Sequence, residues 1–185
     1  MTRAPNTWLI LALGNPGEEF ENSYHNAGML ALSSIIETLV GEKSDALDWK
    51  SHKKLFTYAM FGNFVFARSL TFMNESGIAA MEAVKKIGIT PEHLVVIHDE
   101  SDVPLGDFKV SFDRNSGGHK GAQSVIDQLK TKMFWRLRIG IRPIRETKRK
   151  KAGDFVLAKI TSSAMKKLEL VFREVSEKLK EVTGK

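Results

Sequence analysis

The feature that most constrains the fold is the alternation of short apolar runs with longer segments of helical periodicity. Trp8 to Leu13 is wholly apolar and stops at Gly14-Asn15-Pro16-Gly17, which predicts a buried strand that ends in a tight turn. Asn26 to Val40 then repeats apolar side chains at helical spacing, and Gly41 follows where a helix cap belongs. A strand and a helix in turn along one chain predict an α/β fold, with helices packed on a sheet.

The rest of the chain continues this alternation. A hairpin is predicted where Gly62-Asn63 separates two runs rich in aromatic and β-branched residues, and apolar residues that step by three and four from Met165 to Val182 predict a final helix. The other expected elements are the hairpin strands Leu55 to Phe61 and Phe64 to Arg68, the helices Ile78 to Ile87 and Gly121 to Leu129, and the strands Leu94 to Ile97, Phe108 to Phe112 and Leu137 to Ile141. We therefore expect a single globular α/β domain over residues 1–185, with a mixed twisted β-sheet flanked by helices and a C-terminal amphipathic helix.

Composition excludes several classes of protein and site. The 185 residues include no cysteine, which excludes disulfides, thiolate catalysis and sulfur-ligated zinc. No stretch approaches the roughly 20 apolar residues of a membrane span, and the first apolar run is too short for a secretory signal. We therefore expect a soluble, unexported protein that does not contact membranes, and composition otherwise leaves the compartment open.

Charge is distributed unevenly along the chain. Residues 106–151 carry 13 Lys and Arg against 4 Asp and Glu, a local balance of +9, whereas residues 1–105 carry 8 against 13. This excess would attract a phosphate backbone in a salt-dependent way, or it could simply belong to a solubilising loop. Its densest part is the run Lys148-Arg149-Lys150-Lys151, which is typical of a loop.

Polar clusters occur where an α/β sheet usually binds its ligands, directly after predicted strands. The clusters are Asn15 with His25 and Asn26, then Met73-Asn74, then His98-Asp99-Glu100. A fourth cluster, Ser116 to Gly121, opens a predicted helix and can present backbone N–H groups to an anion.

Other kinds of site are less well supported. The residues that could bind a metal are His25, His98, His119, Asp99 and Glu100, but their spacing matches none of the compact zinc motifs. No phosphate-binding loop or dinucleotide fingerprint is present, so no nucleotide cofactor is expected, and no Gly-x-Ser-x-Gly motif indicates a catalytic serine. Metal-free chemistry without a cofactor is the favoured interpretation.

Five motifs carry a family resemblance. They are Leu13-Gly14-Asn15-Pro16-Gly17 with His25-Asn26-Ala27-Gly28, Thr71-Phe72-Met73-Asn74-Glu75-Ser76-Gly77, His98-Asp99-Glu100-Ser101-Asp102-Val103-Pro104-Leu105-Gly106, Gly117-Gly118-His119-Lys120-Gly121, and Phe134-Trp135-Arg136-Leu137-Arg138-Ile139-Gly140-Ile141. In this order they resemble the bacterial peptidyl-tRNA hydrolase family, from about Leu11 to the final helix. The resemblance implies a single mixed-sheet α/β domain that hydrolyses the ester bond of peptidyl-tRNA and needs no cofactor. With this function we expect a cytoplasmic protein and a monomer.

The resemblance also implies a role for individual residues. His25 would activate water and Asp99 would orient His25. The substrate end of the cleft would be lined by Asn15, Met73, Asn74, His119 and Lys120. The tRNA would be bound by Tyr24, Lys109, Arg138, Lys148, Arg149, Lys150 and Lys151. These roles suit ester hydrolysis, because an imidazole can accept a proton near neutral pH and a carboxamide N–H₂ can stabilise an oxyanion.

The chain departs from the family pattern at three places. Tyr24 stands where the family usually has arginine, Lys120 stands where it has asparagine, and Arg68-Ser69-Leu70-Thr71 replaces a segment that contains Lys-Pro. These changes bear on substrate positioning. The alternative function is a catalytically inactive RNA-binding protein of the same fold. Retention of His25, Asp99, Asn15 and Asn74 favours the enzyme.

Overall fold

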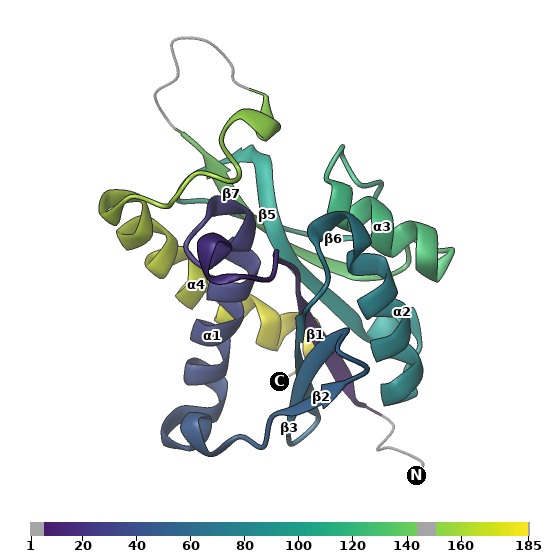
Figure 1. Ribbon diagram of the computed structural model, residues 1–185. Helices are drawn as coiled ribbons and strands as arrows, with labels where there is room; N and C mark the ends of the chain where they lie inside the picture. The colour runs from purple at the N-terminus through teal and green to yellow at the C-terminus, as the bar shows by residue number, and fades with distance from the viewer. Residues whose placement is uncertain (1–5, 144–150, 185) are drawn as a thin grey trace.

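The computed structural model describes residues 6–143 and 151–184 and contains one seven-stranded sheet (Figure 1). The strands are β1 (Trp8–Ala12), β2 (Lys50–His52), β3 (Phe56–Phe61), β4 (Phe64–Ser69), β5 (Leu94–Pro104), β6 (Phe108–Phe112) and β7 (Trp135–Arg142). The α-helices are α1 (Ala27–Val40), α2 (Ser76–Ile87), α3 (Lys120–Leu129) and α4 (Ser162–Thr183). Short 3-10 helices are η1 (Glu18–Phe20), η2 (Tyr24–Asn26), η3 (Gly41–Ala46), η4 (Met73–Glu75), η5 (Pro91–His93) and η6 (Ala152–Asp154).

The sheet is mixed, as predicted, in the order β2-β3-β4-β1-β5-β7-β6. β4, β1, β5 and β7 run parallel, whereas β3 pairs with β2 and β4, and β6 with β7, in antiparallel fashion. The predicted hairpin forms, since Phe61 pairs with Phe64 across its turn. In the sheet, β1 lies between β4 and β5. The chain therefore adds β4 on one side of β1 and later adds β5 on its other side. This reversal of strand order is where an open α/β sheet leaves a crevice at the carboxyl ends of its strands.

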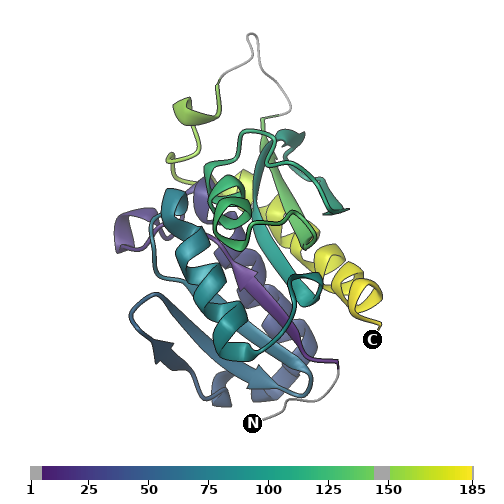
Figure 2. The ribbon, with the colours of Figure 1, turned by 90° about the vertical axis from the view of Figure 1, so that its right-hand side faces the viewer.

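Helices cover both faces of the sheet (Figures 1 and 2). Alternate residues of β1 serve the two cores: Ile10 packs in the core with α1 and α4, while Leu9 packs in the core with α2. The predicted apolar stripe of α4 is buried, as Leu168 and Phe172 show. Burial of a side chain of this size stabilises the fold by roughly 1.5–3 kcal/mol.

Glycine permits two close approaches that position the functional elements. A Cβ on Gly28 would lie 2.5 Å from the carbonyl oxygen of Ile97, so α1 begins in direct contact with β5. A Cβ on Gly77 would lie 2.0 Å from the carbonyl oxygen of Ser124, at the contact between α2 and α3. The amide of Gly77 also donates to Ser124 Oγ at 2.9 Å. The first contact brings η2, just before α1, against β5.

β5 is longer than the sequence pattern predicted. The expectation that His98-Asp99-Glu100 follows the end of this strand is wrong, because the strand continues to Pro104. β7 supplies the hydrogen-bonding partners for the extension, with Asp99 opposite Ile139, whereas β1 ends opposite Ile97. The polar cluster therefore lies inside a strand, beyond the end of its shorter neighbour.

Smaller differences concern the ends of elements. The short strand β2 was not predicted, and α2 begins at Ser76, two residues before the predicted start. Within the described ranges, no helix combines the length and the apolar character that crossing a bilayer requires.

Candidate active site

A cleft of about 940 Å³ opens beyond the carboxyl ends of β1 and β4, beside the extension of β5. It is formed by segments that are far apart in the sequence. The residues predicted at the catalytic and substrate end all line it: Asn15, His25, Met73, Asn74, Asp99, His119 and Lys120. The structure therefore brings the predicted polar clusters together at one site.

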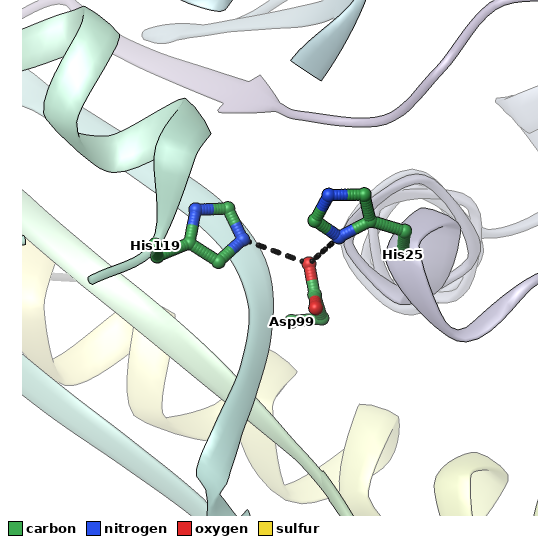
Figure 3. A group of neighbouring side chains, drawn as sticks. All are labelled: His25, Asp99 and His119. Carbon is green, nitrogen blue, oxygen red and sulfur yellow. Dashed lines mark hydrogen bonds and ion pairs between the residues drawn. The ribbon is translucent and has the colours of Figure 1, made fainter. Parts of the chain in front are cut away.

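His25 and Asp99 form the centre of the site (Figure 3). The Nδ1 atom of His25 lies 2.8 Å from Asp99 Oδ1, with 14% of the histidine side chain exposed and 1% of the aspartate side chain. An ionised carboxylate only accepts hydrogen bonds, so Nδ1 is the donor. The Nε2 atom of His25 then carries a lone pair and points away from Asp99, as a general base requires.

His119 is a second donor to the same carboxylate. Its Nε2 atom lies 2.9 Å from Asp99 Oδ1, and its Nδ1 atom accepts the backbone N–H of Ala122 at 3.1 Å, which makes His119 the N-cap of α3. The ring also packs against that of His98, with a centroid separation of 4.3 Å. His98 itself points inward, and its Nδ1 donates to the carbonyl oxygen of Asp99 at 2.6 Å.

The two rings keep Asp99 ionised. Burial by itself would raise the pKa of Asp99, but the electrostatic attraction of His119 and the hydrogen bonds from His119 and His25 outweigh it. The pKa of this carboxyl is therefore held well below its ordinary value. Asp99 is thus an anion at every pH at which the protein would act.

Asn15 is held in one orientation. Its Oδ1 accepts the backbone N–H of Met73 at 2.8 Å, so its N–H₂ group must be the end left for the cleft. Asn26 fixes the backbone beneath, because its side chain accepts the amide of Asn15 at 2.8 Å and donates to its carbonyl at 3.0 Å. Two separate motifs, around residues 15 and 73, are joined by these bonds.

Asp99 and the two histidines that donate to it also carry the kinds of atom that bind metal ions. One atom from each of His25, Asp99 and His119 lies within 4.8 Å of the others. A histidine that ligates through Nε2 carries its proton on Nδ1, but Nδ1 of His119 faces the N–H of Ala122 and must itself be unprotonated. The hydrogen-bonding pattern of His119 therefore suits a donor to Asp99 better than a metal ligand.

The sequence did not reveal the apolar wall of the cleft. Phe20, Phe72, Val156 and Leu157 line it, and Phe72 is 51% exposed. The segment from 156 to 160 is placed by backbone pairing with the segment before α1, including the bond from the amide of His25 to the carbonyl of Val156 at 2.8 Å. No periodicity marks this segment, so only the tertiary structure shows its role.

The residues predicted to bind tRNA have different surroundings. Lys109 is exposed on the edge strand β6. Arg138 is buried and its Nη1 lies 3.4 Å from Glu100 Oε2, so the structure favours a structural role for it. Tyr24 packs edge-on against Phe155 and is not among the described residues that line the cleft. Lys151 lines the cleft, and residues 148–150 lie outside the described part of the chain.

Two further arginines support the site without having been predicted there. Arg142 lines the cleft, and its Nε donates to the carbonyl of Ser101 at 2.5 Å. Arg136 is buried and its Nη2 donates to the carbonyl oxygens of Arg114 and Asn115, at 3.0 and 2.7 Å. Arg136 therefore anchors the loop that leads to His119.

Comparison with known proteins identifies one family. The family model described as peptidyl-tRNA hydrolase matches residues 9–185. The peptidyl-tRNA hydrolase of Sulfurihydrogenibium sp. (strain YO3AOP1) is 33% identical over 171 residues, covering 91% of this chain and 86% of the relative. That of Lactobacillus delbrueckii subsp. bulgaricus is 35% identical over 171 residues, covering 91% and 89%. A crystal structure of peptidyl-tRNA hydrolase from Acinetobacter baumannii shares the fold, with a TM-score of 0.84 at 24% identity over 100% of this chain and 92% of that one. The chain belongs to the peptidyl-tRNA hydrolase family.

Proposed function

We propose that this protein hydrolyses the ester bond between peptide and tRNA in peptidyl-tRNA, with His25 activating the attacking water and Asp99 orienting His25. The observation that carries the mechanism is the 2.8 Å bond from His25 Nδ1 to a buried, ionised carboxylate in the wall of the cleft. This bond assigns the proton to Nδ1 and leaves Nε2 to accept one from water. Asp99 also stabilises the positive charge that the ring acquires as the proton moves.

The carbonyl oxygen of the ester becomes negative as water attacks it. The N–H₂ group of Asn15 is oriented by the Met73 amide, and Asn74 offers a second, exposed carboxamide in the same cleft. We assign these two groups to positioning the ester and stabilising the oxyanion. A donor fixed in advance stabilises such a charge better than water, because it need not reorganise during the reaction.

The two ends of the substrate require different surfaces. Phe20, Phe72 and Leu157 suit apolar side chains of the peptide. Lys120 and Lys151, on the same cleft, suit the phosphates at the acceptor end of the tRNA. Because every group assigned here comes from one chain, we propose that the enzyme acts as a monomer, in the cytoplasm where peptidyl-tRNA occurs.

A single comparison tests this function. Purified protein is incubated with a peptidyl-tRNA whose peptide N-terminus is blocked and, separately, with an unblocked aminoacyl-tRNA. Release of peptide from the first substrate alone is expected. Release from both would contradict the assigned specificity, and binding without release would favour the inactive RNA-binding protein.

Metal-free catalysis is tested in the same assay. The tautomer of His119 leads us to expect that a chelator leaves the rate unchanged. Loss of activity in the chelator, followed by recovery on adding zinc, would show that the cluster around Asp99 binds a catalytic ion.

A further inference from the structure

One oxygen of Asp99 serves two histidines. Oδ1 accepts both from His25 Nδ1 at 2.8 Å and from His119 Nε2 at 2.9 Å (Figure 3). We infer that His119 is a positioning residue that sets the proton affinity of His25 by sharing this oxygen. The link to the rate of hydrolysis rests on the proposed function, whereas the link between the two rings rests on the hydrogen bonds alone.

The helix α3 fixes which nitrogen of His119 donates to Asp99. Its Nδ1 accepts the N–H of Ala122 and so keeps its lone pair, which places the proton of a neutral ring on Nε2, facing Asp99. A second proton on the ring would point at the Ala122 N–H and would add positive charge at the N-terminus of α3, where the helix dipole opposes it. The ring has little freedom to turn away, because its side chain is 7% exposed and packs against His98.

A shared acceptor weakens the attraction of Asp99 for the proton on His25. The carboxylate must hold His25 in the right orientation, but a carboxylate that served His25 alone would also stabilise the protonated ring more strongly. Protonated His25 cannot accept a proton from water. The bond from His119 therefore limits how strongly Asp99 attracts the proton of His25, while Asp99 still orients the ring.

The substitutions tested below leave the other ionisable groups near His25 and Asp99 unchanged. The remaining charged side chains of described residues that line the cleft are Glu100, Asp102, Lys120, Arg142 and Lys151. Glu100 pairs with Arg138 and Asp102 with Arg142. His98 is buried behind His119, where burial holds its pKa well below 6.5 and keeps it neutral.

Two substitutions separate the two bonds of His119. Asparagine places its Oδ1 close to where Nδ1 stands, so His119→Asn keeps an acceptor for the cap of α3 but is too short to reach Asp99. Glutamine extends its N–H₂ to about the position of Nε2, so His119→Gln keeps a donor to Asp99 but loses the cap. The pair is a matched control, since each variant retains the interaction that the other lacks.

The test is a titration of the His25 ring by NMR in substrate-free protein, together with the pH dependence of kcat/KM. In His119→Asn the midpoint of the His25 titration and the acid limb of the profile should both move to higher pH by about 0.5–1 unit, the size expected on losing a hydrogen bond to a carboxylate. In His119→Gln both should stay within about 0.2 unit of wild type, because the bond to the carboxylate is kept.

Three results would overturn the inference: an unchanged His25 midpoint in His119→Asn, equal shifts in both variants, or a loss confined to KM, which would make His119 a substrate contact only. The NMR titration needs no substrate, so it separates this inference from the proposed function. A shifted midpoint in a protein that hydrolyses no peptidyl-tRNA would support the coupling and contradict the function.

Discussion

At the scale of single residues, the role proposed for His25 is to accept a proton rather than to provide a binding surface. Its Nδ1 is occupied by Asp99 and 14% of its side chain is exposed, so its removal takes little binding surface from the ground-state substrate. We expect His25→Ala to lower kcat by about 10²–10⁴-fold, the usual contribution of a general base, with a much smaller change in tRNA affinity. Single-turnover hydrolysis and tRNA binding, measured on one preparation, check this. A near-wild-type kcat would remove His25 from the mechanism.

Lys120 is the departure from the family pattern that lies nearest the proposed chemistry. It is the exposed first residue of α3, lines the cleft and follows His119. An ammonium group only donates hydrogen bonds and carries a full charge, whereas asparagine both donates and accepts. If Lys120 donates to the substrate, Lys120→Met should lower kcat/KM about 3–30-fold and Lys120→Asn should lower it less. Equal values for the wild type and both variants would place Lys120 in solvent.

Local motifs predicted the polar half of the cleft but not its apolar half. Asn15, His25 and Asp99 belong to motifs of polar and glycine residues that stand out against apolar strands. Val156 and Leu157 belong to an irregular segment that reaches the cleft only because its backbone pairs with residues 22–25. A few backbone hydrogen bonds between irregular segments leave no periodicity in either one, so no pattern along the chain predicted this contact.

At the scale of elements, the contact between α1 and β5 determines where His25 lies relative to Asp99. A Cβ on Gly28 would lie 2.5 Å from the carbonyl oxygen of Ile97 and 3.0 Å from that of Leu13, both of them backbone atoms that cannot move alone. Gly28→Ala should therefore destabilise the fold by about 1–3 kcal/mol and lower kcat more than tRNA affinity, because α1 must move away from β5. Urea unfolding and kcat are compared with those of Thr38→Ala, on the exposed side of α1. Matching values for the two variants would show that this part of the fold tolerates a methyl group.

β5 carries His98, Asp99 and Glu100 into the interior, and this makes stability depend on pH. Burial, with smaller contributions from His119 and Arg136, holds the pKa of His98 well below 6.5, although Asp99 opposes the shift. Folded His98 thus stays neutral as the pH falls below 6.5, while the unfolded chain takes up a proton. The unfolded state is therefore favoured increasingly on acidification, and the stability that His98 contributes is fully present only above pH 6.5.

The variant His98→Asn isolates this contribution. An asparagine can still donate to the carbonyl of Asp99 but does not titrate. Between pH 6.5 and pH 5, the free energy of unfolding of the wild type should fall more steeply than that of His98→Asn, by up to about 1.4 kcal/mol per pH unit, the value for one proton. Urea unfolding at several pH values measures both slopes. Parallel slopes would mean that His98 takes up its proton as readily in the folded protein as in the unfolded chain.

The element pattern was predicted more accurately than the ends of the elements. Periodicity identifies a segment as strand or helix, so the hairpin, α4 and the mixed sheet were all foreseen. Where a strand ends depends on its neighbours, and β5 continues through three polar residues because β7 lies beside it. The same cause explains why Asp99 reaches the cleft from within a strand and not from a loop.

At the scale of the whole molecule, the charge balance of residues 106–151 overstates the charge available to a ligand. Arg138 is paired with Glu100 and Arg142 with Asp102, and both acidic partners precede residue 106 in the chain. The guanidinium of Arg136 is buried against backbone carbonyls. Counting charges by sequence position could not reveal these pairs, which form between adjacent strands. Among the described residues of this segment, the exposed cations that a phosphate backbone could meet are Lys109, Arg114, Lys120, Lys130 and Lys151.

The basic run at 148–151 provides the test of how tRNA is attracted. Replacing Lys148, Arg149, Lys150 and Lys151 with alanine should raise KM for peptidyl-tRNA by about 10-fold or more at physiological salt and leave kcat within about twofold, since His25 and Asp99 are untouched. For every phosphate that the variant no longer binds, the slope of log affinity against log salt should also fall by about 0.7–0.9. The matched control removes four charges from α4, at Lys166, Lys167, Arg173 and Lys178, on the face of the sheet opposite α3. If the two quadruple variants have equal salt slopes, the attraction depends on net charge and the run at 148–151 binds no phosphate of its own. A reduced slope in the first variant alone would assign phosphate binding to the run, whose last residue, Lys151, lines the cleft.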